Sequence, residues 1–228
     1  MLVLFSGSRG SGKSTIAKNL YSNLDNFSFE YLHQSQWRKK SNNIFSKVLW
    51  IFYFLTFFRF QVCKVFFRRF YRDIRSKRTK MGIARIYLPC IFSYHLIKLK
   101  NKKEKCIIYE SDFVTWSADK VLDNSFYPSE VENYYKSVIL PNVNEVLVVI
   151  CDTPLDYAFE RWSHRENKIL SSKARREWIN KRKVWKKARE KVFHVLSKIP
   201  NIRIIKLNGL EDPKKNSSYI ANILLNKE

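Results

Sequence analysis

An eight-residue stretch near the N-terminus has residue types and spacing suited to holding a phosphate chain. Residues 7–14 satisfy the pattern G-x-x-x-x-G-K-S/T and contain three of the five glycines in the 228-residue chain. Glycines let successive backbone N–H groups turn toward one anion, and a following helix adds the positive end of its dipole. Lys13 would reach the β- and γ-phosphates of a nucleotide, and the Ser14 hydroxyl would ligate Mg²⁺. The candidate nucleotide-binding residues are Gly7, Ser8, Arg9, Gly10, Ser11, Gly12, Lys13, Ser14 and Thr15.

A carboxylate follows the apolar run at residues 106–109. Ligands of open α/β sheets bind at the carboxyl ends of the strands, so Glu110 is well placed for chemistry. It would hold a water of the Mg²⁺ shell or accept the proton of an attacking hydroxyl group. Asp112 is a second candidate for the same work. The alternative for both residues is a solvated acidic strand end.

Two arginines, Arg161 and Arg165, lie four residues apart in a stretch with helical spacing, so they share one helix face. Phosphoryl transfer spreads negative charge over oxygen atoms that paired guanidinium groups stabilise. We expect residues 161–191 to form a basic lid and the helix that follows it. Lys173, Arg175 and Arg176 lie in the part of this stretch expected to close as a lid. A solvated basic helix face is the alternative.

Short apolar runs alternate with helical patterns along the rest of the chain. Strands are predicted at residues 2–6, 27–32, 106–109, 146–151 and 202–207, and helices at residues 14–24, 154–164, 173–198 and 217–225. This alternation favours an α/β fold with a parallel sheet and right-handed crossovers. The elements would bring the loop at residues 7–14, the acid at 110 and the arginines to one edge of the sheet.

Together these features resemble the P-loop nucleoside and nucleotide monophosphate kinases, with the thymidylate-kinase-like branch as the nearest match. Residues 107–111 lie where thymidylate kinases carry Asp-Arg-Tyr and deoxynucleoside kinases carry Glu-Arg-Ser. Residues 149–165 resemble the family's fourth strand, its following helix and its lid arginines. The resemblance covers the chain except for residues 39–105, and the loop at residues 7–14 is its most specific part.

The resemblance implies a single P-loop kinase domain over residues 1–228, with a five-stranded parallel sheet in the order 2-3-1-4-5. It implies transfer of the ATP γ-phosphoryl group to a small acceptor with Mg²⁺, with Asn208 and Gly209 near the adenine. It also points to a dimer.

The acceptor stays open because two features depart from the family. Ser111 stands where both relatives carry arginine, and residues 33–37 match neither relative's substrate motif. A nucleotide, a nucleoside and a sugar-like molecule all remain candidates. His33, Trp37, Arg85 and Asp112 are further candidates for contacting the acceptor.

The positive charge is concentrated in two segments. The formal net charge is +23, of which residues 38–103 carry +17 and residues 161–191 carry +10. The second excess fits a lid that faces phosphates. The first lies in the insertion at residues 39–105, where an uncharged aromatic run at 48–58 precedes basic residues mixed with aromatic ones. We expect helices that pack on the sheet over the acceptor site. The alternatives are a basic helix on an anionic membrane surface and a nucleic-acid groove.

Two other functions compete with the small-molecule kinase. The charge would also suit a nucleic-acid-directed P-loop enzyme, such as a polynucleotide kinase or an NTPase, or a non-catalytic nucleotide-binding regulator that docks on a membrane. The four cysteines show no zinc-ligand spacing, and they favour reduced thiols. We therefore expect a cytoplasmic protein, with peripheral contact at the inner membrane face as the alternative for residues 39–105.

Overall fold

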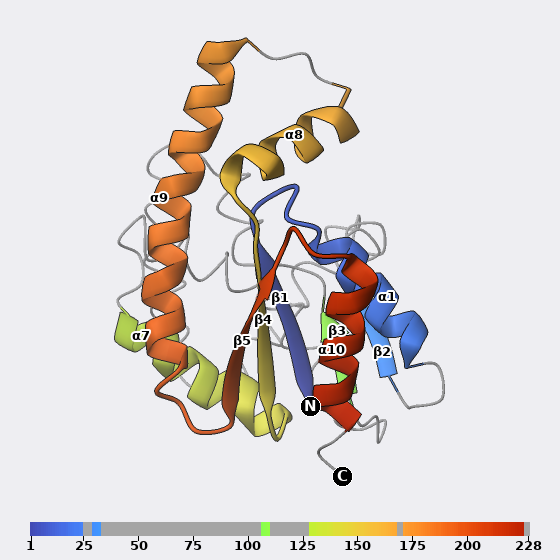
Figure 1. Cartoon of the computed structure of the whole chain (residues 1–228). Coiled ribbons are helices and arrows are strands. Elements are labelled where there is room, and N and C mark those ends of the chain that lie inside the picture. The colour runs from blue at the N-terminus through green and yellow to red at the C-terminus, as the bar shows by residue number, and fades with distance from the viewer. Residues whose placement is uncertain (25–28, 33–105, 110–127, 168–170, 226–228) are drawn as a thin grey trace, which may run out of the picture.

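A parallel β-sheet forms the centre of the protein, whose computed structural model describes residues 1–24, 29–32, 106–109, 128–167 and 171–225 (Figure 1). The strands are β1 (Leu2–Gly7), β2 (Phe29–Leu32), β3 (Cys106–Tyr109), β4 (Val146–Asp152) and β5 (Ile202–Asn208). They lie in the order β2-β3-β1-β4-β5, which is the order that the resemblance implied. All neighbouring pairs are parallel. The predicted α/β class with a parallel sheet is confirmed.

Strands β1 and β3 are buried along their whole length, as expected for central strands of a parallel sheet that is covered on both faces. All six residues of β1 are buried. On one face, Val3 and Phe5 form a core with α1 (Lys13–Asn23) and α10 (Pro213–Leu225), which pack on each other. Figure 1 shows these two helices side by side in front of the sheet.

Helix α9 (Ser172–Leu196) stands beside the β5 edge of the sheet and packs against α8 (Leu155–Arg165) and α7 (Pro128–Tyr134) (Figure 1). Its buried residues are Ala188, Arg189, Val192 and Leu196. Their spacing of one, three and four residues places them on one face of the helix. Ser171 caps the helix because its hydroxyl accepts a hydrogen bond from the Ala174 N–H at 3.3 Å.

The helical region before β4 was not predicted from the sequence. After α7 the chain continues in a π-helical turn, η1 (Tyr135–Ile139), and a 3₁₀ turn, η2 (Leu140–Asn142). Tyr134 and Tyr135 are fully buried, and their rings meet edge to face with centroids 6.2 Å apart. Aromatic residues have weak intrinsic helix preference, so this region depends on tertiary packing.

The predicted insertion at residues 39–105 lies outside the described residues. None of the helices in the described ranges is long and apolar enough to span a bilayer. The basic stretch after Ser171, expected to close as a lid, forms the first turns of α9, and its role as a lid stays a prediction. Only residues 166–171 separate α8 from α9, and residues 168–170 of this connection are not described.

Candidate active site

The predicted phosphate-binding loop joins the end of β1 to the start of α1. Gly10 and Gly12 have φ angles of 84° and 86°, a left-handed conformation that residues with a β-carbon rarely adopt. Gly12 is the N-cap of α1, and its carbonyl oxygen accepts hydrogen bonds from Thr15 N and Ile16 N at 3.0 Å each. The first N–H groups of a helix have no carbonyl partner in a preceding turn, so the amino end of α1 is suited to an anion.

The side chain of Lys13 folds back over this loop. Its Nζ donates to Ser8 O at 3.3 Å and to Gly7 O at 3.4 Å, which holds the ammonium group beside the residues that follow β1. The hydroxyl of Ser11 is buried and has no hydrogen-bond partner among the described residues. A lysine ammonium group and two left-handed glycines in one loop fit the triphosphate of a nucleotide, and Ser14 would hold its Mg²⁺.

Helix α8 closes one side of the loop. A β-carbon on Gly10 would collide with the carbonyl oxygen of Ala158, so the loop and the helix backbone are in direct contact there. One turn later, Arg161 Nη1 donates to Gly209 O at 2.9 Å. The same nitrogen lies 3.9 Å from the place where a β-carbon on Gly12 would be. The predicted arginine therefore reaches across the loop.

The stretch predicted to lie near the adenine is held against the same loop. Gly209 N donates to Asp152 O at 2.9 Å, and a β-carbon on Gly209 would collide with Thr153 Oγ1. That hydroxyl in turn donates to Ser11 O at 3.1 Å. Asn208 O accepts from Asn216 Nδ2 at 3.0 Å. The ends of β4 and β5 are thus tied to the loop that follows β1.

Arg165 is placed differently from Arg161. Its side chain is 62% exposed and pairs with Glu166 at 3.3 Å. Arg175 in α9 pairs with Asp156 and Glu160 of α8, at 3.1 Å each, and so joins the two helices. Of the two predicted clamp residues, the structure brings only Arg161 to the loop.

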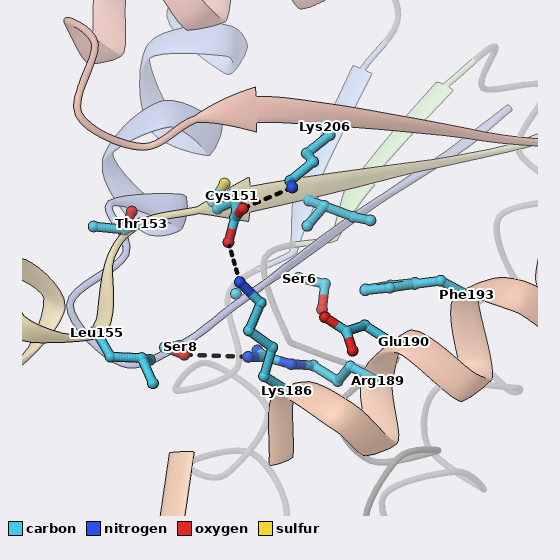
Figure 2. Close-up of a pocket in the computed structure, with 13 residues that line it drawn as sticks. Ser6, Ser8, Cys151, Thr153, Leu155, Lys186, Arg189, Glu190, Phe193 and Lys206 are labelled. Atoms are coloured by element: carbon cyan, nitrogen blue, oxygen red, sulfur yellow. Dashed lines mark hydrogen bonds and ion pairs between the residues drawn. The ribbon is translucent and has the colours of Figure 1, made fainter. Parts of the chain in front are cut away.

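A cavity of about 150 Å³ lies between the inner face of α9 and the carboxyl ends of β1 and β4. Lys186 and Arg189 of α9 and Lys206 of β5 are among the residues that line it (Figure 2). Arg189 is 7% exposed and donates to Ser8 Oγ at 3.1 Å, so α9 contacts the phosphate-binding loop directly. Lys186 and Lys206 approach the two carboxylate oxygens of Asp152 at 3.1 and 2.8 Å.

The sequence analysis did not predict Asp152, Lys186, Arg189 or Lys206 as site residues. Arg189 lies three residues after Lys186 and three before Val192, on the face of α9 that turns inward. The sequence shows this spacing, but it does not indicate which of the many basic residues of this segment contacts the phosphate-binding loop.

The pKa of the Asp152 carboxyl is lowered. Partial burial of Asp152 opposes ionisation, but hydrogen bonds from Lys206 and Lys186 and their positive charges outweigh it. The same bond to Asp152 raises the pKa of Lys206. Both shifts favour the charged forms, so Asp152 acts as an ionised link between β4, β5 and α9.

Several predicted site residues lie outside the described residues: Glu110, Asp112, His33, Trp37 and Arg85. Among the residues that the structure describes, no group of three or more His, Cys, Asp and Glu side chains is arranged to hold a metal ion. Cys106 and Cys151 are buried, and burial raises the pKa of the Cys106 thiol to about 11.

Comparison with known proteins supports the fold. No family model matches the chain, and no curated protein matches it. A solved structure of deoxyadenosine kinase from M. mycoides, with the products dCMP and a flexible dCDP bound, matches with a TM-score of 0.57 and 18% sequence identity. That match covers 99% of this chain and 100% of the other. Structures of that enzyme with dCTP and with dATP match at 0.52, with the same identity and coverage. The chain thus has the α/β fold of these kinases.

Proposed function

We propose that this protein is an ATP-dependent kinase that transfers the γ-phosphoryl group to a hydroxyl group of a small molecule. The observation that carries the proposal is the loop at residues 7–14, folded with Gly10 and Gly12 left-handed and spanned by Arg161, which bonds to Gly209 O at 2.9 Å. Backbone donors, a lysine and an arginine gathered at one strand end suit a reaction that depends on positioning and charge stabilisation.

Each residue has a part in this proposal. Lys13 leaves its two carbonyl partners for the β- and γ-phosphates when the nucleotide binds. Arg161 neutralises negative charge that develops during transfer, from its position above the loop. Mg²⁺, held by the Ser14 hydroxyl with Glu110 in its shell, would supply further charge neutralisation on the phosphate oxygens. Glu110 is also the proposed acceptor of the proton from the attacking hydroxyl group.

A 2′-deoxynucleoside is the first acceptor to test. The structures that share the fold are of a deoxyadenosine kinase, with dCMP and dCDP, dCTP or dATP bound. Residues 107–111 keep the glutamate of the deoxynucleoside-kinase motif, although Ser111 stands where that motif carries arginine. Nucleoside monophosphates and sugar-like molecules are the alternatives.

The test is a measurement of ADP release by the purified full chain with ATP, Mg²⁺ and a panel of acceptors. Deoxynucleosides should stimulate ADP release, and Lys13→Ala should lower kcat/KM at least about 100-fold, as expected for loss of a transition-state donor. Lys18→Ala, an exposed lysine on α1, is the matched control and should keep the native rate.

Two results would overturn the proposal. One is a rate that is unchanged in Lys13→Ala. The other is stimulation by 5′-hydroxyl oligonucleotides alone, which would favour a polynucleotide kinase.

The two arginines of α8 give a sharper test of the site. Arg161→Ala should lower kcat/KM about 10- to 100-fold, the range expected from a lost hydrogen bond to a charged group. Arg165→Ala should have a smaller effect, because this side chain is exposed and pairs with Glu166. Steady-state kinetics at saturating acceptor would separate KM for ATP from kcat. Equal losses in the two variants would contradict the assigned role of Arg161.

A further inference from the structure

The outer face of α9 carries a row of basic side chains on the side away from the proposed active site. The row, called here the α9 basic row, consists of five exposed residues: Lys173, Arg176, Lys183, Lys187 and Lys191. Successive members are three, seven, four and four residues apart, which are spacings that keep side chains on one helix face. At 1.5 Å per residue the row is about 27 Å long. In Figure 1, α9 lies to one side of the sheet.

The inner and outer cations of α9 have different surroundings. On the inner side, Arg175 pairs with Asp156 and Glu160, Lys186 pairs with Asp152, and Arg189 bonds to Ser8. These basic side chains therefore have partners within the fold.

Within the described residues, the five members of the α9 basic row form no ion pair. The only acids on α9 are Glu177 and Glu190, which lie at the two sides of the row. Lysines stacked four residues apart repel each other in a free helix. A row of like charges with no internal partner is suited to an external polyanion.

The composition of this face argues against two kinds of polyanion, an anionic membrane surface and a single-stranded nucleic acid. A helix that docks on a membrane presents an apolar side for insertion, and Val184 is the only exposed large apolar residue on α9. Single-stranded nucleic acid is usually held by exposed aromatic rings that stack on bases. Trp178 and Trp185 are only partly exposed, and the guanidinium of Arg182 lies over both rings. The α9 basic row would therefore recognise a polyanion by its charge alone.

We propose that the α9 basic row binds the phosphate backbone of a nucleic-acid duplex, without reading its sequence. With both strands counted, a duplex carries about one negative charge per 1.7 Å of axis, so a segment as long as the row carries roughly 16 of them. The row lies on the opposite side of the helix from Arg189 and the phosphate-binding loop, so a docked duplex leaves that loop accessible. This surface is independent of the proposed kinase reaction.

The binding test uses fluorescence anisotropy of a labelled 20-base-pair duplex of arbitrary sequence with the full chain. If the five cations contact phosphates, log K should fall with log salt at a slope of about −4.5 from this row alone, which is roughly 500-fold between 50 and 200 mM salt. Neutralising three of them, in Lys183→Gln, Lys187→Gln and Lys191→Gln combined, should reduce the magnitude of the slope by about 2.7.

The matched control removes three exposed lysines from the other side of the molecule, Lys18→Gln, Lys214→Gln and Lys215→Gln combined. It lowers the net charge equally, and the basic residues at 38–103 are intact in both variants. Its slope should equal that of the native chain. If the triple α9 variant is unstable in thermal denaturation, Lys187→Gln alone should reduce the magnitude of the slope by about 0.9.

Three outcomes would overturn the proposal. The first is equal slopes in the α9 variant and the control. The second is tighter binding of a single strand than of the duplex. The third is that the α9 variant loses binding to vesicles containing anionic lipid but keeps its binding to the duplex, which would assign the row to a membrane. Kinase turnover without duplex present should be unchanged in the α9 variant, so failure here and failure of the proposed activity are separable.

Discussion

Gly10 and Gly12 adopt the same left-handed conformation next to different surroundings. Gly10 is pressed against the backbone of α8 at Ala158, whereas the nearest atom to a β-carbon on Gly12 would be Arg161 Nη1, at 3.9 Å. The first glycine therefore allows close packing of the loop beneath α8, and the second allows the chain to turn into α1. The sequence motif marks both positions but does not tell these two roles apart.

Alanine substitution should separate the two roles. Gly12→Ala should destabilise the fold by about 1–2 kcal/mol, the cost of a left-handed residue with a β-carbon. Gly10→Ala carries the same strain plus a collision with the α8 backbone, so its loss of stability should be clearly larger than that of Gly12→Ala. Thermal denaturation measures the difference, at about 2–4 °C per kcal/mol for a chain of this size. Equal shifts would contradict the contact between Gly10 and Ala158.

Helices α8 and α9 form a unit that depends on an aromatic cluster. Trp178 of α9 stacks on Trp162 of α8 with ring centroids 5.5 Å apart, and it meets Phe159 edge to face at 5.4 Å. The guanidinium of Arg175 lies over the Phe159 ring at 5.5 Å. Because α8 carries Arg161 and α9 carries Arg189, this packing fixes the positions from which both arginines reach the loop.

Removing the Trp178 ring should weaken this unit. Trp178→Ala should cost about 2–3 kcal/mol, less than a fully buried tryptophan because the ring is partly exposed. Trp178→Phe should recover part of the loss. Urea denaturation gives the free energy of unfolding, and near-UV circular dichroism reports the loss of the stacked rings.

A matched control for Trp178 lies on the neighbouring helix. Tyr157→Ala, on the exposed side of α8, should change stability by less than about 0.5 kcal/mol. If the two alanine variants lost equal stability, the cluster would not be what joins α8 to α9.

At the scale of the whole molecule, charge is used in two ways. Asp152 connects three parts of the fold through Lys186 and Lys206, and its lowered pKa means that this link is ionised at neutral pH. The basic side chains on the outer face of α9 have no such acid within the described residues. The net charge of +23 thus combines cations that hold the site together with cations that face outward.

The Asp152 link makes stability depend on pH in a defined direction. A carboxyl whose pKa is lower when folded stabilises the fold above its unfolded pKa, and this contribution is lost as pH falls through the folded pKa. Asp152→Asn should therefore be less stable than the native chain by about 1 kcal/mol at pH 7, because both ion pairs are partly exposed.

The pH profile tests this link. The difference between native chain and Asp152→Asn should shrink as pH falls below the ordinary value of 3.8, as measured by urea denaturation. Glu132→Gln, which breaks an exposed pair with Lys136, is the control and should cost less than about 0.5 kcal/mol at pH 7. A difference that grew toward low pH would contradict the link.

Local patterns in the sequence predicted the elements well, because each depends on residues close together in the chain. The apolar runs predicted strands that differ from the observed ones by two residues at most, and the glycine spacing predicted the loop at residues 7–14. Helix α10 begins at Pro213, four residues before the prediction, since Pro213 suits a first helical turn. The region from α7 to η2 was missed because its buried tyrosines are placed by packing against distant elements.

By itself, the sequence determined the α/β class, the phosphate-binding loop and a basic arginine-bearing segment, because spacing along the chain encodes secondary structure and backbone turns. Only the tertiary structure decided that Arg161 spans the loop and that Arg165 is exposed and pairs with Glu166. It also decided that Arg189, 181 residues after Ser8 in the chain, reaches the Ser8 hydroxyl from α9. The reason is physical: parallel strands joined by crossover helices bring residues from distant parts of the chain together at one edge of the sheet. Which of several similar arginines arrives there depends on helix rotation and packing, and the basic composition of the segment does not encode either of them.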